Sequence, residues 1–428
     1  MNVRPDLATA RAFDDCLAHA TLMSPTVARG VVLDGVGEIA GTETTLLTGL
    51  LGRVAATDIL SEVALPRFDN SAVDGFALHA DDLRRPSPLT LKIVGKTAAG
   101  HTMAGTLRPG NTVRILTGAR VPDGAAAIVL EERSTRHLAG VTFHFLPDYG
   151  ANIRGRGEDV STGTIVVAKG TVFDGRHIAI LAASGNARAC TKRKLRVGVL
   201  STGDELIEAG NEVGPNSIVD TNGPMLRSLL TSEAIAVSDL GIVPDEREAV
   251  ARTMLDAASH LDLLITSGGV AGSDADHVAG AIIDAGGRCE TLKLALRPGK
   301  PIGRGSVGRM QVLALPGNPV AALVNFLLFG RPLIRRMLGA TEVSTMQYSA
   351  RTAESFVHKV GRTEFVLAKV DGFGPDGIVR IGKLGRGGSA RLLPLVNADG
   401  FAEIGAELGN VAENSLVNYH PFSMPLAL

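Results

Sequence analysis

The stretch Leu263-Leu-Ile-Thr-Ser-Gly-Gly-Val270 decides the fold class of this chain. Its first three residues are continuously apolar, which is typical of a strand that is buried on both faces of a sheet. The Thr-Ser-Gly-Gly segment that follows predicts a turn whose backbone N–H groups can approach a phosphate closely. An ordinary strand-to-helix turn would have the same pattern, so both interpretations stay open for this stretch alone.

Strand and helix patterns alternate on both sides of this stretch. Strands are predicted at 197–200, 235–242, 263–266, 289–294 and 312–315, and helices at 222–233, 245–258, 276–285 and 318–338. The last helix contains Pro332, where a kink is expected because proline lacks the N–H that a helix interior needs. Residues 196–338 are therefore expected to form a mostly parallel sheet covered by helices.

The flanking segments are richer in strands than in helices. Runs at 89–94, 112–116, 127–130 and 141–146 predict a strand-rich region before the α/β domain, and residues 1–45 look helical and then irregular. Short runs at 365–370, 378–381 and 415–418, separated by glycine turns, predict a small β-barrel or sandwich at the C-terminus. The fold class is thus a multidomain combination of α/β and β.

Bulk composition narrows the function classes. The 428 residues carry 43 basic and 44 acidic side chains and a formal net charge of −1, which argues against binding of nucleic acid or an anionic membrane surface by the chain as a whole. No apolar stretch reaches the roughly 20 residues that a membrane span requires. Three widely spaced cysteines, Cys16, Cys190 and Cys289, indicate neither a disulfide framework nor a thiolate metal site, and they fit a reducing cytoplasm.

A second glycine turn, Leu315-Pro-Gly-Asn-Pro319, follows another predicted strand and opens a long helix. Asn318 suits the N-cap position and Pro319 the first helical position, which would direct free N–H groups toward an anion. Capping by itself would explain this sequence. Two such turns in one predicted sheet favour a phosphorylated ligand.

Charged loop residues add two further candidate sites. The stiff segment Lys293-Leu-Ala-Leu-Arg-Pro-Gly-Lys-Pro301 could present Arg297 and Lys300 to an oxyanion, although a solvated basic loop has the same composition. Acidic residues in glycine-rich turns could hold Mg²⁺ together with a ligand phosphate, or they could simply be solvated. These acidic residues are Asp74, Asp159, Asp204, Glu205, Asp220, Asp274 and Asp276.

The segment Phe68-Asp-Asn-Ser-Ala-Val-Asp-Gly-Phe-Ala77 resembles the FDNSAMDGYA signature of the MoeA family of molybdopterin molybdotransferases and of the matching gephyrin domain. Seven further segments similar to motifs of that family follow in order and extend the resemblance over nearly the whole chain from about residue 46. They are 115–119, 157–159, 201–206, 220–222, 266–270, 298–301 and 316–320.

The resemblance implies an elongated homodimer of four-domain subunits. The implied domains are an elongated dimerisation domain at 1–45 and 163–193, a strand-rich domain at 46–162, a MogA-like molybdopterin-binding α/β domain at 194–338, and a β-barrel domain at 343–428. The implied reaction inserts molybdate into adenylylated molybdopterin, with Mg²⁺ as cofactor and with release of AMP. The upstream adenylyltransferase and recipient molybdoenzymes are further candidate partners, and the implied location is cytoplasmic.

Site roles implied by the resemblance fall into five groups. The catalytic candidates are Asp74, Asp159, Glu205, Asp276 and Lys300, and the metal candidates are Glu205, Asp245 and Asp276. The candidates for binding the pterin substrate are Thr117, Ser267, Gly268, Gly269, Pro316, Gly317 and Asn318. The candidates for the molybdate pocket are Arg297, Lys300, Arg362 and Ser389, and Asp74, Thr117 and Asp159 are expected on the partner-side wall of the cleft.

Several positions depart from the family pattern. Where SGGVSVGDYD is usual, the chain has Ser267-Gly-Gly-Val-Ala-Gly-Ser-Asp-Ala-Asp276, which lacks a serine hydroxyl at Ala271. Arg297 stands where lysine is common in the family, and Ala321 stands where serine is common. Leu367 stands where the family often has an arginine after the Glu-Phe pair. The altered loop from Ala271 to Ser273 motivates an alternative, a divergent molybdopterin-binding carrier or regulatory protein without turnover. A nucleotide pyrophosphatase would explain the glycine turns but not the segment 68–77.

Overall fold

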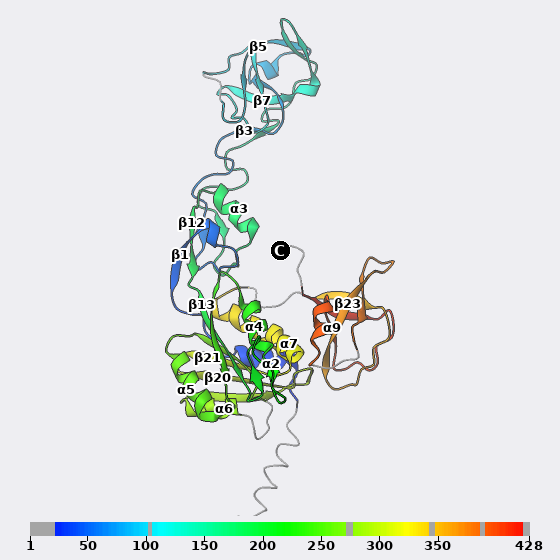
Figure 1. The fold of residues 1–428 in the computed structure, drawn as a ribbon. Helices are drawn as coiled ribbons and strands as arrows, with labels where there is room; N and C mark the ends of the chain where they lie inside the picture. The colour runs from blue at the N-terminus through cyan, green and yellow to red at the C-terminus, as the bar shows by residue number, and fades with distance from the viewer. Residues whose placement is uncertain (1–21, 102–104, 271–276, 342–346, 386–389, 423–428) are drawn as a thin grey trace, which may run out of the picture.

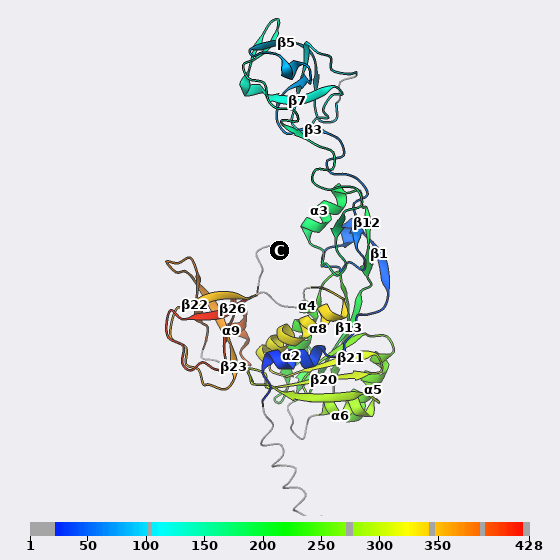
Figure 2. The same cartoon turned by 180° about the vertical axis from the view of Figure 1, so that it is seen from behind.

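The computed structural model describes residues 22–101, 105–270, 277–341, 347–385 and 390–422. The molecule is elongated, with a small β module at one end, a narrow stalk in the middle, and an α/β domain with a β-barrel beside it at the other end (Figure 1). The view from behind shows the same separation of the β module from the α/β domain (Figure 2). In the described part of the chain no helix is long and apolar enough to cross a membrane.

A six-stranded sheet forms the centre of the α/β domain, in the order β16-β13-β17-β21-β20-β18. The first four strands run parallel, as the sequence predicts, whereas β20 and β18 continue the sheet antiparallel. Strand β20 was not predicted, because its glycine-containing sequence reads as loop. The strands are β13 (Leu195–Thr202), β16 (Ile235–Val243), β17 (Leu263–Ser267), β18 (Arg288–Lys293), β20 (Pro301–Val307) and β21 (Met310–Leu315).

Helices cover both faces of this sheet, which explains why its central strands are continuously apolar. One face packs against α5 (Arg247–Ala258) and α6 (His277–Asp284). The other face packs against α2 (Pro25–Leu33), α4 (Asn222–Leu230), α7 (Pro319–Asn325) and α8 (Arg331–Met337). Each fully buried leucine or valine in these layers stabilises the domain by about 1.5–3 kcal/mol.

The helix predicted at 318–338 is interrupted. Helix α7 ends at Asn325, a π-helical turn spans Phe326–Gly330, and α8 begins at Arg331 with Pro332 in its first turn. Pro332 cannot donate to the carbonyl four residues earlier, so the irregular hydrogen bonding lies just before it. The continuous helix expected over 318–338 is therefore divided by a π-helical turn just before Pro332.

The C-terminal region is a closed barrel. Its strands β22 (Tyr348–Thr352), β23 (Thr363–Phe373), β24 (Val379–Lys383), β25 (Gly400–Ile404) and β26 (Leu416–Pro421) pair in a ring that the β23–β25 pairing completes. The short strand β19 (Leu296–Arg297) of the α/β domain pairs in parallel with the start of β23. This pairing joins the barrel to the basic segment of the α/β domain. Helix α9 (Leu392–Asn397) lies between β24 and β25 in the chain.

The stalk pairs β1 (Thr42–Leu46) with β12 (Arg188–Lys192) and β2 (Ile59–Leu60) with β11 (Ile165–Val167), next to α3 (Gly175–Ala183). Its small core joins Leu50, Phe173 and Leu181. The end module contains a sheet in the order β7-β4-β6-β5-β9-β8, and β3 pairs with β10 at its base. Its strands are β3 (Asn70–Ser71), β4 (Gly75–His79), β5 (Leu89–Thr97), β6 (Asn111–Ile115), β7 (Ala125–Leu130), β8 (Ser134–His137), β9 (Gly140–Phe143) and β10 (Ile153–Arg154).

Candidate active site

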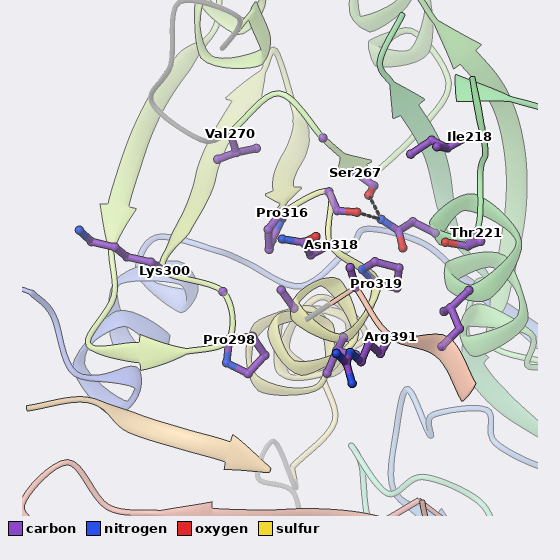
Figure 3. A pocket seen from close by; sticks show the side chains of 18 of the residues that line it. Ile218, Thr221, Ser267, Val270, Pro298, Lys300, Pro316, Asn318, Pro319 and Arg391 are labelled. Carbon is purple, nitrogen blue, oxygen red and sulfur yellow. Dashed lines mark hydrogen bonds between the residues drawn. The ribbon is translucent and has the colours of Figure 1, made fainter. Parts of the chain in front are cut away.

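A cavity of about 880 Å³ opens at the carboxyl ends of β13, β17 and β21 and extends to the barrel. Ligands of open α/β sheets bind beyond the carboxyl ends of the strands, because the chain turns away there and leaves a crevice. Figure 3 shows the turn residues, the basic segment and α7 around this space. The cavity brings together ten of the site residues that the family resemblance implies: Glu205, Asp245, Ser267, Gly268, Gly269, Arg297, Lys300, Pro316, Gly317 and Asn318.

The turn after β17 is built on two glycines. Gly268 has a φ of +98° and Gly269 a φ of +64°, both in the region that disfavours side chains. A Cβ added to Gly268 would lie 2.4 Å from the carbonyl oxygen of Thr202, so the main chain of β13 leaves no room for one. The Gly268 N–H donates to the Leu315 carbonyl at 3.1 Å, which ties this turn to the second one.

Asn222 couples the two turns, although no sequence pattern marks it as a site residue. Its buried amide Nδ2 donates to Ser267 Oγ at 2.7 Å and to the Gly317 carbonyl at 2.6 Å (Figure 3). The amide therefore fixes the relative position of the turns at 267–269 and 316–318. The segment Asp220-Thr-Asn222 was recognised as a motif, but no spacing rule indicates which side chain crosses the sheet edge.

Asn318 occupies the N-cap position of α7 and Pro319 the first turn, as predicted. The Asn318 side chain makes no capping hydrogen bond. Capping therefore does not account for the asparagine, and its side chain lines the cavity instead.

Carboxylates line one edge of the cavity. Asp245 accepts a hydrogen bond from the Thr202 hydroxyl, and its own N–H donates to Asp204. Asp220 accepts from Ser201 Oγ at 2.7 Å and from two N–H groups at the start of α4, which gives it a structural role.

Two of the three predicted metal candidates lie within the residues that the structure describes. Glu205 and Asp245 line the cavity, whereas Asp276 lies outside the described residues. Among the residues that the structure describes, no three acidic, histidine or cysteine side chains converge at ligand distance. Two carboxylates fit Mg²⁺, because this ion is usually held by one or two carboxylates together with substrate phosphate.

The barrel side of the cavity is basic. Arg297 and Lys300 line it, and Lys383 and Arg391, which the sequence analysis missed, add two more cations. The Arg297 side chain is 65% exposed, and its Nε lies 3.7 Å from Glu364 Oε1. Arg362 is exposed but does not line the cavity, and Ser389 lies outside the described residues. Lys383 ends β24 and Arg391 directly precedes α9, so both come from segments far along the chain from Arg297 and Lys300, and no local sequence pattern predicts that they line the same cavity.

Two predicted residues, Asp74 and Thr117, follow β3 and β6 of the end module, which lies at the opposite end of the molecule from the α/β domain (Figures 1 and 2). Asp74 accepts from the N–H and the hydroxyl of Thr117, each at 2.7 Å. These two hydrogen bonds hold the pKa of the Asp74 carboxyl below its usual range. Asp159 is exposed in the loop next to β10.

Comparison with known proteins matches all three regions of the chain. Residues 19–185 match the family described as "MoeA N-terminal region (domain I and II)", residues 198–336 match "Probable molybdopterin binding domain", and residues 349–422 match "MoeA C-terminal region (domain IV)". A molybdopterin molybdenumtransferase of Haemophilus influenzae is 35% identical over 401 residues, which cover 92% of this chain and 98% of that protein. The chain belongs to the MoeA family.

Further relatives extend the comparison. Molybdopterin molybdenumtransferase 2 of Mycobacterium tuberculosis is 34% identical over 333 residues, which cover 76% of this chain and 82% of that protein. The crystal structure of a molybdopterin biosynthesis MoeA protein from Pyrococcus horikoshii has 28% identity and a TM-score of 0.79, and the match covers 94% of this chain and all of that one. The predicted fold class, an α/β domain with strand-rich N-terminal domains and a C-terminal β-barrel, is confirmed.

Proposed function

We propose that this MoeA family chain is a molybdopterin molybdenumtransferase that inserts molybdate into adenylylated molybdopterin and releases AMP. The observation that carries the proposal is the cavity, which is lined both by two coupled glycine turns and by four cationic side chains. The turns suit a phosphorylated ligand, and the cations suit a tetrahedral metal oxyanion. The names of the curated relatives support the same reaction.

The residues of the chain would act by positioning and electrostatics. The main-chain N–H groups of Gly269, Gly317 and Asn318 would hold the pyrophosphate of the substrate, because Pro316 has no N–H and that of Gly268 donates to the Leu315 carbonyl. Arg297 and Lys300 would hold molybdate beside the dithiolene, so that both reactants share one cavity and their encounter becomes intramolecular. The same cations would stabilise the negative charge that develops as the phosphate bond breaks.

Glu205 and Asp245 are the described residues that would hold Mg²⁺, with Asp276 as a third candidate. When bound, the ion would neutralise phosphate charge. The hydroxyl of Thr202 orients the Asp245 carboxylate toward this edge of the cavity.

The proposal includes a homodimer. Asp74, Thr117 and Asp159 cannot reach the cavity of their own chain, so a second copy would have to bring this segment to it. The proposed division into 1–45 with 163–193, 46–162, 194–338 and 343–428 assigns dimerisation to the first of these domains. We further propose a cytoplasmic location and contact with an adenylyltransferase and recipient molybdoenzymes.

The test is AMP release from adenylylated molybdopterin by the purified full-length chain. The proposal predicts release only when molybdate and a divalent cation are both present. Tight binding without AMP release would replace it with a carrier function. Release that does not depend on molybdate would replace it with a pyrophosphatase.

A further inference from the structure

A buried histidine in the barrel lies directly behind the basic side of the cavity. The His358 side chain is 2% exposed, and Nδ1 lies 2.9 Å from the Leu408 carbonyl oxygen while Nε2 lies 3.0 Å from the Arg362 carbonyl oxygen. Carbonyl oxygens only accept hydrogen bonds, so both contacts are satisfied only when both ring nitrogens carry a proton. A neutral ring would leave one nitrogen lone pair facing a carbonyl oxygen in a buried site.

A carboxylate stands between this ring and the cavity. Glu364 Oε2 lies 3.9 Å from His358 Nε2, and Oε1 of the same carboxylate lies 3.7 Å from Arg297 Nε. The Glu364 side chain is only 13% exposed, so its charge acts in an environment where water screens it weakly. The parallel pairing of Arg297 with Glu364 between β19 and β23 fixes this arrangement.

The balance of these charges bears on oxyanion binding. If Glu364 were opposed by Arg297 alone, the pair would be neutral and the carboxylate would repel an incoming anion. A protonated His358 offsets the carboxylate from behind and leaves the charge of Arg297 available. The Arg297 atom that lies beside Glu364 is Nε, so the terminal nitrogens of this exposed side chain can point into the cavity.

We propose that His358 is a positioning residue for the oxyanion pocket: as an imidazolium, it holds the turn that carries Arg362 and balances Glu364, so that Arg297 can bind the anion. The inference rests on the proposed function for the identity of the anion. The contacts on which the inference depends are the two carbonyls that the ring meets and the Glu364 carboxylate beside it. These contacts are present in the chain by itself, so they can be tested whether or not the protein has transferase activity.

The first test is spectroscopic. A long-range proton–nitrogen NMR correlation spectrum of the full chain with labelled histidine, recorded at neutral pH, should show one ring with both nitrogens protonated. That signal should be absent from His358→Gln. A His358 ring with a single protonated nitrogen would overturn the inference, whether or not the protein has transferase activity.

The second test measures molybdate binding by calorimetry, together with KM for molybdate and kcat. Loss of the charge that balances Glu364 should weaken molybdate binding about tenfold in His358→Gln, with a matching rise in KM and little change in kcat. The double variant His358→Gln/Glu364→Gln should recover most of the lost affinity, because it removes the unbalanced carboxylate. A purely structural histidine would show no such recovery.

His420→Gln is the matched control. His420 Nε2 contacts Glu403 Oε2 at 2.7 Å in the same barrel, and neither residue lines the cavity. This variant should lose barrel stability without weakening molybdate binding. Equal loss of molybdate affinity in both histidine variants would refute the special role of His358. A wild-type protein that binds molybdate without releasing AMP would refute the proposed transferase and leave this inference intact.

Discussion

Substitution of Gly268 by alanine tests whether the first glycine turn needs its close main-chain approach. The added Cβ would lie 2.4 Å from the Thr202 carbonyl oxygen. The alanine would also have to adopt a φ of +98°, which residues with a side chain rarely adopt. The unfavourable φ costs about 1–2 kcal/mol, and overpacking adds about 1–3 kcal/mol because β13 must shift. The expected loss of stability in the α/β domain is therefore about 2–5 kcal/mol.

Gly210→Ala provides the matched comparison. Gly210 has a φ of +96°, nearly that of Gly268, but a Cβ there meets nothing within 4 Å. This variant should lose only the φ contribution of about 1–2 kcal/mol. The difference between the two variants isolates the steric contribution of the turn.

The assay is unfolding of the full chain by denaturant. A spectroscopic probe placed in the α/β domain reports its unfolding separately, because a chain with several domains need not unfold in one step. Affinity for adenylylated molybdopterin is measured in parallel. Gly268→Ala should also bind this ligand at least about tenfold more weakly, since one lost charge-assisted hydrogen bond corresponds to about 1.5–3 kcal/mol. Equal stability of the two variants, with unchanged ligand affinity in Gly268→Ala, would refute the account of the turn.

Three further predictions concern the basic side, the coupling amide and the barrel. Lys300→Ala should weaken molybdate use by about tenfold or more through loss of a charge-assisted contact, and unchanged molybdate dependence in steady-state kinetics would remove Lys300 from the site. Asn222→Ala should cost about 1–3 kcal/mol of stability and weaken ligand binding, because it uncouples the turns; calorimetry that finds normal affinity would contradict this. Burial raises the pKa of Tyr419 to about 12, so the folded barrel resists ionisation of this phenol and loses stability as pH rises above the unfolded value near 10. Between pH 10 and 12 the free energy of unfolding of Tyr419→Phe should therefore fall by about 1–2 kcal/mol less than that of the wild type. If the free energy of unfolding of the two proteins falls equally with pH, Tyr419 does not contribute to the pH dependence.

The α/β core could be predicted because its signals are local. The strand at 263–266 is continuously apolar and ends in glycines, so burial on both faces and a turn at its end follow from a few neighbouring residues. The observed strand extends only one residue further, to Ser267. The two glycine turns could be brought together by the general rule that parallel strands end at one sheet edge.

The remaining site residues depend on long-range geometry. Asn222 donates from the start of α4 to two turns, and Arg391, which precedes α9, lines the cavity together with residues of the α/β domain. The antiparallel strand β20 escaped prediction because glycines at 303 and 305 weaken its strand pattern. The hydrogen bonds between Asp74 and Thr117 join two loops of the end module that are 43 residues apart in the chain, and no local pattern predicts them.

A crystal structure of the full chain with adenylylated molybdopterin and molybdate tests the central claim most directly. The account predicts the pyrophosphate on the N–H groups of Gly269, Gly317 and Asn318, with molybdate against Arg297 and Lys300. A ligand bound to another surface, or a pyrophosphate on the basic side with the glycine turns empty, would contradict it.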